Sequence, residues 1–168
     1  GAAQGPTATA ESGVTGETIN ITRTTGTNAG SYTSTASISS VTGGRAKAGN
    51  YKLIGATKAF TINRAATATA AAVNKTYNGE SQTGVTGSYV SWANSTTGID
   101  AGSYTAIATP DENHAWSDGT TAAKSITWTM SAKEVAVTWG TTTTFIYNGV
   151  AQGPTASAES GVTGETIN

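Results

Sequence analysis

The sequence predicts an all-β protein made of small modules, each an antiparallel sandwich or a related small β-fold. Three features of the 168-residue chain support this class: short runs in which apolar and polar residues alternate, Gly-containing turns between those runs, and internal repeats. No apolar i, i+3, i+4, i+7 segment is long enough to indicate an amphipathic helix. Short strands at regular spacing with frequent turns are typical of antiparallel sandwiches.

Strands are expected where every second residue is apolar. Ile126, Trp128 and Met130 fall on one face of a strand, and the next run, 135–139, has its apolar residues at odd positions. This change of parity indicates that one strand ends a module and the next strand opens its neighbour. Other strands are predicted around the following residues: Ile19 and Ile21, Tyr32 to Ile38, Phe60 and Ile62, Ala65 to Val73, Tyr104 to Ala108, and Phe145 with Tyr147.

The first twenty residues recur at the other end of the chain. Gly1–Asn20 and Gly149–Asn168 are identical except at their second and ninth positions. The two copies start 148 residues apart, so the chain holds one full period and the first twenty residues of the next. We therefore expect an internal excerpt of a longer tandem array.

A weaker repeat divides this period into two related modules. The matched stretches are Gly1 with the Gly of Tyr77-Asn78-Gly79, Ala29–Thr33 with Ala101–Thr105, Asn50–Leu53 with Asn113–Trp116, and Lys58–Ile62 with Lys124–Trp128. The predicted modules are 1–64, which lacks its opening strands, a related module at 65–133, and the opening strands of a third module at 134–168, equivalent to the first. Direct strand-to-strand junctions without a Pro- or Gly-rich linker predict a stiff rod.

Composition excludes several classes of function. Charged residues make up 11% of the chain and the net charge is −1, so there is no basic footprint for nucleic acid and no electrostatic reason to bind a membrane. The chain has no cysteine, which excludes disulfides and thiolate metal sites. No apolar run approaches the length of a transmembrane helix. In an internal excerpt, the lack of a signal peptide says nothing about secretion.

Two short motifs in each module carry a resemblance to a known group of proteins. They are Tyr147–Gly149 with Gln152 and Ala29–Thr33 in the first kind of module, and Tyr77–Gly79 with Gln82 and Ala101–Thr105 in the second. With these motifs the chain resembles the bacterial Ig-like and MBG-type repeats of large, adhesin-like cell-surface proteins, over nearly all of its length. The resemblance implies tandem Ig-like antiparallel β-sandwich modules, or β-grasp modules as the alternative. It also implies an extracellular location at the cell surface and, for most such modules, a role as spacers.

The richest polar loop, Asp111–Gly119, is the first candidate site. Its carboxylates could bind Ca²⁺, but it lacks an Asp-x-Asp-x-Asp pattern and its counterpart in the first module carries no carboxylate, so no metal or other cofactor is predicted. Trp116 with His114 could form a platform for a sugar, and Trp92 could add a partly exposed ring. For Trp116 the repeat favours packing in the core, because Leu53 takes the same place in the first module.

Covalent cross-links are the second candidate. Some bacterial surface β-modules form isopeptide bonds between Lys and Asn or Asp, and Lys58 and Lys124 begin matched strands. A Lys at a strand edge also prevents edge-to-edge aggregation, and we favour that interpretation. No enzyme activity is predicted, because the one histidine, His114, has no Ser or Cys nucleophile at a recognisable spacing.

The sequence leaves four functions open. The first is a stiff spacer or stalk that contacts neighbouring identical modules in its own chain. The second is a filament in which Val135–Tyr147 of one copy inserts before Gly1 of the next, as in donor-strand addition. The third is an adhesin module that binds a glycan or a host protein, and the fourth is an accessory module beside a catalytic domain.

Overall fold

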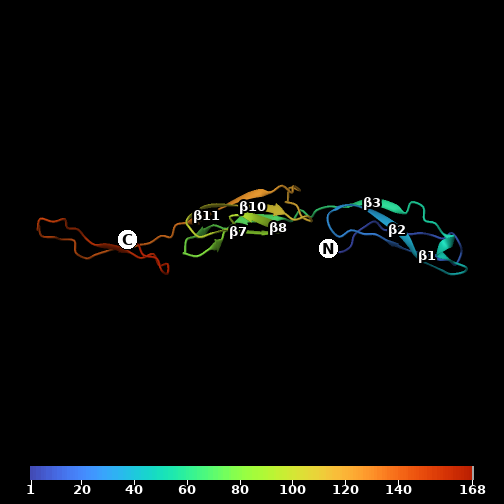
Figure 1. The fold of residues 1–168 in the computed structure, drawn as a ribbon, viewed down its shortest axis with the longest axis horizontal. Coiled ribbons are helices and arrows are strands. Elements are labelled where there is room, and N and C mark those ends of the chain that lie inside the picture. The colour runs from blue at the N-terminus through green and yellow to red at the C-terminus, as the bar shows by residue number, and fades with distance from the viewer. Residues whose placement is uncertain (168) are drawn as a thin grey trace. The chain divides into compact units, whose positions relative to one another are not determined.

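The computed structural model describes residues 1–167. Within them the chain forms thirteen strands and one short 3-10 helix, Ala48–Asn50, which confirms the predicted all-β class (Figure 1). The strands are distributed over five sheets, of three, four, two, two and two strands. The described strand pairs are antiparallel except that of β5 (Lys75–Thr76) with β11 (Lys124–Ser131), which is parallel.

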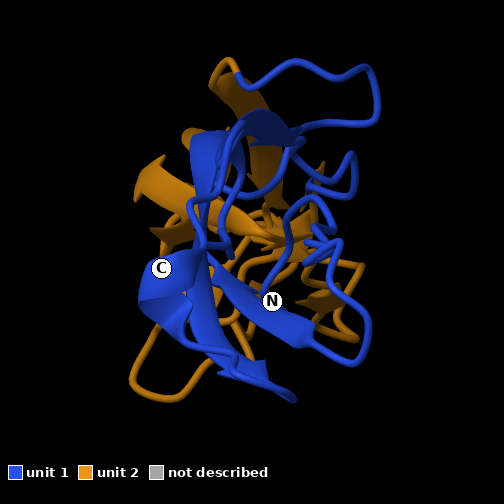
Figure 2. Ribbon diagram, turned by 90° about the vertical axis from the view of Figure 1, so that its right-hand side faces the viewer, with its two compact units in different colours: residues 1–68, 110–121 blue, residues 69–109, 122–168 orange. Residues whose placement is uncertain are grey.

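Contacts divide the chain into two compact units (Figure 2). The first unit contains Gly1–Ala68 with Pro110–Thr121, and the second contains Thr69–Thr109 with the residues from Ala122 onwards. The predicted module boundaries follow the sequence repeat instead. The two divisions differ most at Pro110–Thr121, which lies in the second module by sequence but packs with the first unit.

The first unit is built on the sheet β1-β2-β3, comprising Thr18–Arg23, Gly30–Thr42 and Thr57–Ile62. The long strand β2 serves two partners, because its first half pairs with β3 and its second half pairs with β1. The register with β1 shifts between Asn20 and Ile21, where a bulge interrupts the ladder. The predicted strands around Ile19, Tyr32 and Phe60 are thereby confirmed.

Aromatic stacking organises the centre of this sheet. Tyr32 on β2 stacks on Phe60, its cross-strand neighbour on β3, with ring centroids 5.3 Å apart. The Tyr32 ring covers Gly26, where a Cβ atom would come within 2.8 Å of the ring. Further along β2, Ser34 is buried and its hydroxyl donates a hydrogen bond to the Thr24 carbonyl at 2.7 Å. The buried hydroxyl is therefore satisfied.

The second unit contains the other four sheets. Its largest sheet has the order β5-β11-β10-β8, comprising Lys75–Thr76, Lys124–Ser131, Gly102–Pro110 and Val90–Asn94. The two-stranded sheets pair β4 (Thr69–Ala72) with β7 (Val85–Ser88), β6 (Gln82–Thr83) with β9 (Thr97–Gly98), and β12 (Val137–Trp139) with β13 (Ala156–Ala158). β11 contains the strongest alternating run of the sequence, which confirms that prediction.

Trp128 forms the centre of the second core. Its side chain is fully buried, among small and aliphatic residues that include Val85 and Ala106. The indole stacks on Tyr104, with ring centroids 4.5 Å apart, and its Nε1–H donates to the Ser95 carbonyl at 2.8 Å. The largest apolar side chain of the unit is thus buried with its one polar group bonded.

The two units repeat the same stacking pair, in a register that the sequence alignment missed. The opposed residues are Tyr32 with Phe60 in the first unit and Tyr104 with Trp128 in the second. The sequence alignment made Ile62 equivalent to Trp128 and Lys58 equivalent to Lys124. In the fold Phe60 is the residue equivalent to Trp128, so the alignment of this strand is wrong by two residues. The shared Lys-x-x-Thr pattern favours that alignment, but the contact of each large ring with its Tyr sets the register in the fold.

The predicted strand at Phe145–Tyr147 is absent from the described residues. Ile146 and Tyr147 are almost fully exposed and lie outside every strand. The corresponding residues of the second module, Lys75–Thr76, form β5 by pairing with the end of β11. Alternation alone therefore does not produce a strand where the pairing edge is missing.

Candidate functional site

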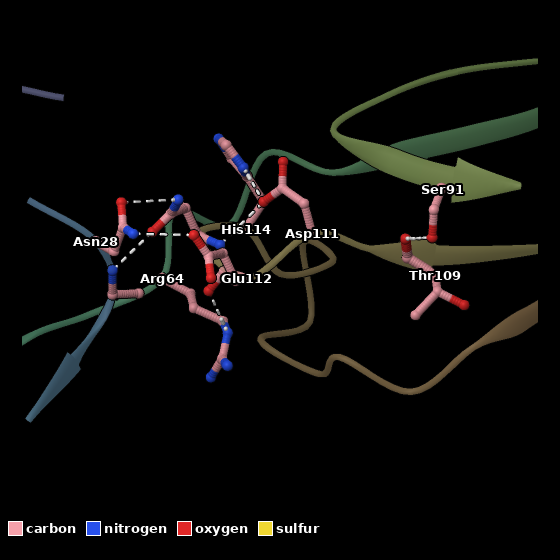
Figure 3. Close-up of polar contacts among 9 residues, drawn as sticks. Asn28, Arg64, Ser91, Thr109, Asp111, Glu112 and His114 are labelled. Carbon is pink, nitrogen blue, oxygen red and sulfur yellow. Dashed lines mark hydrogen bonds and ion pairs between the residues drawn. The ribbon is translucent and has the colours of Figure 1, made fainter.

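The loop that follows β10 folds around the carboxylate of Asp111 (Figure 3). Asp111 Oδ1 accepts a hydrogen bond from the backbone N–H of Asn113 at 2.9 Å and lies 2.5 Å from His114 Nδ1. The hydrogen bond with His114 lowers the pKa of Asp111 below its ordinary value, so this carboxyl group is ionised at neutral pH. These local contacts hold the tight turn from which the side chains of Glu112 and Asn113 extend.

Glu112 and Asn113 bind the turn that precedes β2. The side-chain amide of Asn28 donates to Glu112 Oε1 at 2.9 Å, and the backbone N–H of Ala29 donates to Asn113 Oδ1 at 2.7 Å (Figure 3). The Asn113 amide donates in turn to Asn28 Oδ1 at 3.4 Å. A loop of the second sequence module is therefore bonded to a turn of the first.

The same loop is bonded to the segment after β3. Arg64 Nε donates to the Glu112 carbonyl at 3.0 Å, and the backbone N–H of Ala65 donates to the Asn113 carbonyl at 2.9 Å. The Ala115 N–H returns a bond to the Ala65 carbonyl at 2.8 Å. We call the following residues the junction clamp: Asn28, Ala29, Arg64, Ala65, Glu112 and Asn113.

The chemistry of the junction clamp suits the positioning of two chain segments. Its groups are side-chain amides, backbone amides, one carboxylate and one guanidinium, and they bond to one another. Each such bond contributes about 0.5–1.5 kcal/mol net. Together these bonds also fix an orientation, because several directional hydrogen bonds from both modules restrict rotation between the loop and the turn.

The structure places the three residues considered for a ligand platform, Trp92, His114 and Trp116, in different surroundings. Trp116 is only 4% exposed, so its ring face is not available for stacking on a sugar. His114 is partly exposed and bonds to Asp111. Trp92 belongs to the second unit, where it packs half-buried against the core around Trp128.

Lys58 and Lys124 are exposed, at positions that are not equivalent in the two sheets. The residue opposite Lys58 in the register is Ser34, and the residue opposite Lys124 is Ala108. Neither opposite residue is the Asn or Asp that an isopeptide bond requires. Over the same residues 1–167, no three His, Asp or Glu side chains gather to hold a metal ion.

A second polar contact lies in the second unit, where the sequence had indicated no site. The Tyr77 hydroxyl donates to the carboxylate of Glu165, and Lys133 Nζ donates to the Gly161 carbonyl at 2.8 Å. These groups border a cleft of about 340 Å³ that Asp100 also lines. The Tyr77 pKa is raised, first by the hydrogen bond to Glu165, because a phenolate would lose that bond and face a carboxylate.

One sequence signal could have revealed this second contact. Glu165 occupies the repeat position of Glu17, whose carboxylate accepts a hydrogen bond from Tyr51 in the first unit. A Glu with the same neighbours in sequence thus bonds a Tyr hydroxyl in each unit. The sequence identity between the two segments was evident, but the partner tyrosines come from unrelated positions in the repeat.

Two further findings bear on function. Among the described residues, no helix has the length and hydropathy needed to cross a lipid bilayer. A comparison with known proteins found no family model, no curated protein and no solved structure that matches this chain.

Proposed function

We propose that the chain is a structural segment of an extracellular bacterial surface protein or fibre, in which tandem Ig-like modules act as a stiff spacer or stalk. The two-level repeat of the sequence supports this role, as does its resemblance to bacterial Ig-like and MBG-type repeats. The proposed partners are neighbouring copies of the same modules, in the same chain or in other copies joined head to tail.

The junction clamp is the observation that carries this proposal. A spacer transmits direction only if each module is held at a fixed angle to the next, since domains joined by a short linker otherwise move freely. Glu112 and Asn113 from one sequence module bond to Asn28 and Arg64 from the other. All of these residues belong to the first compact unit, so the clamp ties a loop of the second sequence module to the first module within one folded unit.

The packing around Trp128 supports the Ig-like sandwich as the module fold. Trp128 on β11 packs against Val85 on β7, a strand of a different sheet, and against Tyr104 on β10. Packing of two sheets through inward-facing side chains is the defining feature of a sandwich. NMR tests this fold. Nuclear Overhauser effects between the Trp128 indole and Val85 are expected if the two sheets pack face to face.

The experiment on the spacer role measures how independently the two sequence modules tumble. In the unaltered chain, ¹⁵N relaxation should give modules 1–64 and 65–133 a common rotational correlation time. In the Asn28→Ala/Asn113→Ala variant the clamp loses the three bonds made by the Asn28 and Asn113 side chains, so the two correlation times should separate and fall.

The matched control is Asn20→Ala, which removes a side-chain amide bonded at 3.0 Å to Ser40 within the first sheet. This variant should keep the common correlation time, because its bond does not join the modules. Two separate correlation times in the unaltered chain would contradict the stiff-spacer proposal.

The second candidate function is an adhesin module that recognises a glycan or a host protein. The observation that favours it is the partly exposed ring of Trp92 on β8, since half-exposed aromatic rings are common in contact surfaces. Binding to a glycan array or to host proteins that is lost in Trp92→Ala, with the fold retained, would support this role. Unchanged binding, or none, would reject Trp92 as the site.

A further inference from the structure

The six-residue sequence Ser-Gly-Val-Thr-Gly-Glu occurs twice in the chain. We call Ser12–Glu17, in the first unit, the first loop, and Ser160–Glu165, in the second unit, the second loop. In each loop the Ser hydroxyl accepts a hydrogen bond from the Val backbone N–H, at 3.1 Å in the first and 3.0 Å in the second. The Glu N–H donates to the Val carbonyl at 3.1 Å and 3.2 Å respectively.

Both glycines of each loop also adopt the same backbone conformation. Their φ angles lie between 59° and 84°, in the left-handed region that favours glycine. With these angles and the internal hydrogen bonds, the loop sequence determines its own shape. The first loop and the second loop are therefore the same preformed element in two surroundings.

The second loop is seated on a face of its unit. Besides the hydrogen bonds from Tyr77 and Lys133, a close apolar contact holds it, because Val162 lies directly over Gly79. A Cβ atom on Gly79 would be 2.4 Å from Val162 Cγ1, so the absence of a side chain at position 79 makes room for the valine. We call Tyr77, Gly79 and Lys133 the receptor face.

The first loop presents its valine with more of the side chain in solvent than the second loop does. Val14 is 51% exposed, whereas Val162 is half-buried. Glu17 accepts a hydrogen bond from Tyr51 through one carboxylate oxygen. A carboxylate has about four lone-pair sites, so Glu17 has the capacity to accept a second hydroxyl.

We propose that the first loop docks on the receptor face of a second copy of this chain. In this contact Val14 takes the place of Val162 over Gly79, and Glu17 faces the hydroxyl of Tyr77. The second loop is held close by the chain, which raises its effective concentration, so docking by the other copy occurs when the second loop is displaced. Different faces of the two copies meet, so the contact is heterologous and extends head to tail.

This inference rests on the proposed structural function, because it names the contact through which copies of the chain would join. It differs from the insertion of Val135–Tyr147 that the sequence suggested. No strand has to be exchanged between copies, because the docking element is already folded.

Engineered cysteines test this contact in the full chain, which has no cysteine of its own. The Cβ position of Gly79 is 3.8 Å from Val162 Cβ, inside the range of about 3.5–4.5 Å seen in disulfides. The Gly79→Cys/Val162→Cys variant should therefore form a disulfide within one chain. The Gly79→Cys/Val14→Cys variant should form disulfides between chains and give a ladder on a non-reducing gel, because the side chain at position 79 also crowds out Val162.

The matched control is Gly79→Cys/Ile54→Cys, in which the second cysteine replaces a 92% exposed residue outside both loops. We expect the Val14 variant to cross-link at least about tenfold faster than this control, as specific docking raises the local thiol concentration. Equal rates would overturn the proposal. A disulfide between positions 14 and 79 within one chain would overturn it as well.

A second measurement covers the case in which a cysteine at position 79, where φ is +84°, disturbs its turn. Val162→Asp should displace the second loop and make the average mass rise with concentration in sedimentation equilibrium. Adding Val14→Asp should return the protein to a monomer, whereas adding Thr15→Asp in the same loop should not. A Val162→Asp variant that stays monomeric up to about 1 mM, the scale of effective concentrations on short tethers, would overturn the proposal.

The outcome can be separated from a failure of the spacer role. The relaxation experiment alters Asn28 and Asn113 in the junction clamp, and the docking experiment alters the two loops and the receptor face. A chain with a rigid joint and no docking would retain the spacer role and lose only the head-to-tail contact.

Discussion

Tyr32 in the first unit and Tyr104 in the second belong to the same repeated stretch, Ala-Gly-Ser-Tyr-Thr, yet the cores that they support are closed to different degrees. Tyr104 stacks on Trp128, which is fully buried, whereas Tyr32 stacks on Phe60, which is only half-buried. The stacking centroids are 4.5 Å apart in the second unit and 5.3 Å in the first. One supersecondary pattern thus tolerates two levels of packing.

The difference comes from what lies against the larger ring. A Cβ atom on Gly84 would be 1.9 Å from Trp128, so the indole occupies the space of a side chain. In the first unit a Cβ on Gly5 would lie 3.6 Å from Phe60, which is an ordinary contact. Trp128 is buried because its ring packs directly on the backbone of Gly84. This close packing leaves no room for a side chain at position 84.

The largest expected effect is the removal of either large ring. Trp128→Ala should lower the free energy of unfolding of the second unit by about 3–5 kcal/mol, because it leaves a cavity and frees the Ser95 carbonyl. Phe60→Ala should cost the first unit less, about 2 kcal/mol, since its ring is already partly hydrated. Urea titrations followed by residue-resolved NMR give both values, and equal losses would remove the distinction between the cores.

The next effect tests the glycine fit. Gly84→Ala should destabilise the second unit by about 1–3 kcal/mol through overpacking against Trp128. In the first unit, Gly5→Ala beside Phe60 should change the stability by no more than about 0.5 kcal/mol. Combining Gly84→Ala with Trp128→Phe should recover part of the loss, and a loss that is unchanged by the smaller ring would place the strain elsewhere.

A smaller effect concerns the residue two positions after each Tyr. Ser34 in the first unit is buried and bonded to the Thr24 carbonyl, and its counterpart Ala106 is fully buried in the second. Ser34→Ala should cost about 1 kcal/mol by freeing that carbonyl. Ala106→Ser should cost about 1–3 kcal/mol by placing a hydroxyl in the apolar core. Thermal unfolding followed separately in each unit measures the two stability losses. An Ala106→Ser substitution that stabilises the protein would show that a hydrogen-bond partner or water is accessible at this position of the second core.

The smallest effect is a pH dependence present in both units. Hydrogen bonds to Glu17 and Glu165 raise the pKa of Tyr51 and of Tyr77 above the ordinary value. Because the folded-state pKa is the higher one, the related stability is fully present below about pH 10 and is lost as the pH rises through the folded-state pKa.

Tyr77→Phe should therefore flatten the alkaline loss of stability in the second unit only, and Tyr51→Phe should do so in the first only. Hydrogen exchange of each unit between about pH 8 and about pH 11 measures this dependence. Tyr147→Phe is the control, since that side chain is 92% exposed. An alkaline profile that does not change in either of the first two variants would contradict the role of the Tyr–Glu bonds.

The sequence predicted those parts of the fold that depend on nearby residues. Alternation located β11 because Ile126, Trp128 and Met130 face one core. The repeat between Leu53 and Trp116 indicated packing for a Trp that is buried. Alternation failed at Phe145–Tyr147, because a strand also needs a partner edge. A shared Lys misplaced the register of the last strand, because an exposed Lys carries no packing constraint.

The junction clamp could not be predicted in the same way. It joins Asn28 to Glu112 and Asn113, more than eighty positions apart, through side chains that are individually ordinary in polar turns. The second loop carried a stronger signal, since Ser160–Glu165 repeats Ser12–Glu17 without change. Identity showed that the element recurs, but only the fold shows that Tyr77 and Lys133 receive it.

The two junction chemistries also have a consequence for how the gene can change. One contact between segments of different sequence modules uses Asn28, Glu112 and Asn113, whereas the other uses Tyr77, Lys133 and the second loop. Loss or gain of a single module by recombination would bring together faces that do not match. In the tandem array that we propose, copy number would change without loss of either contact only in whole pairs of modules, so length variants of such an array should differ by multiples of 148 codons, the spacing between positions 1 and 149.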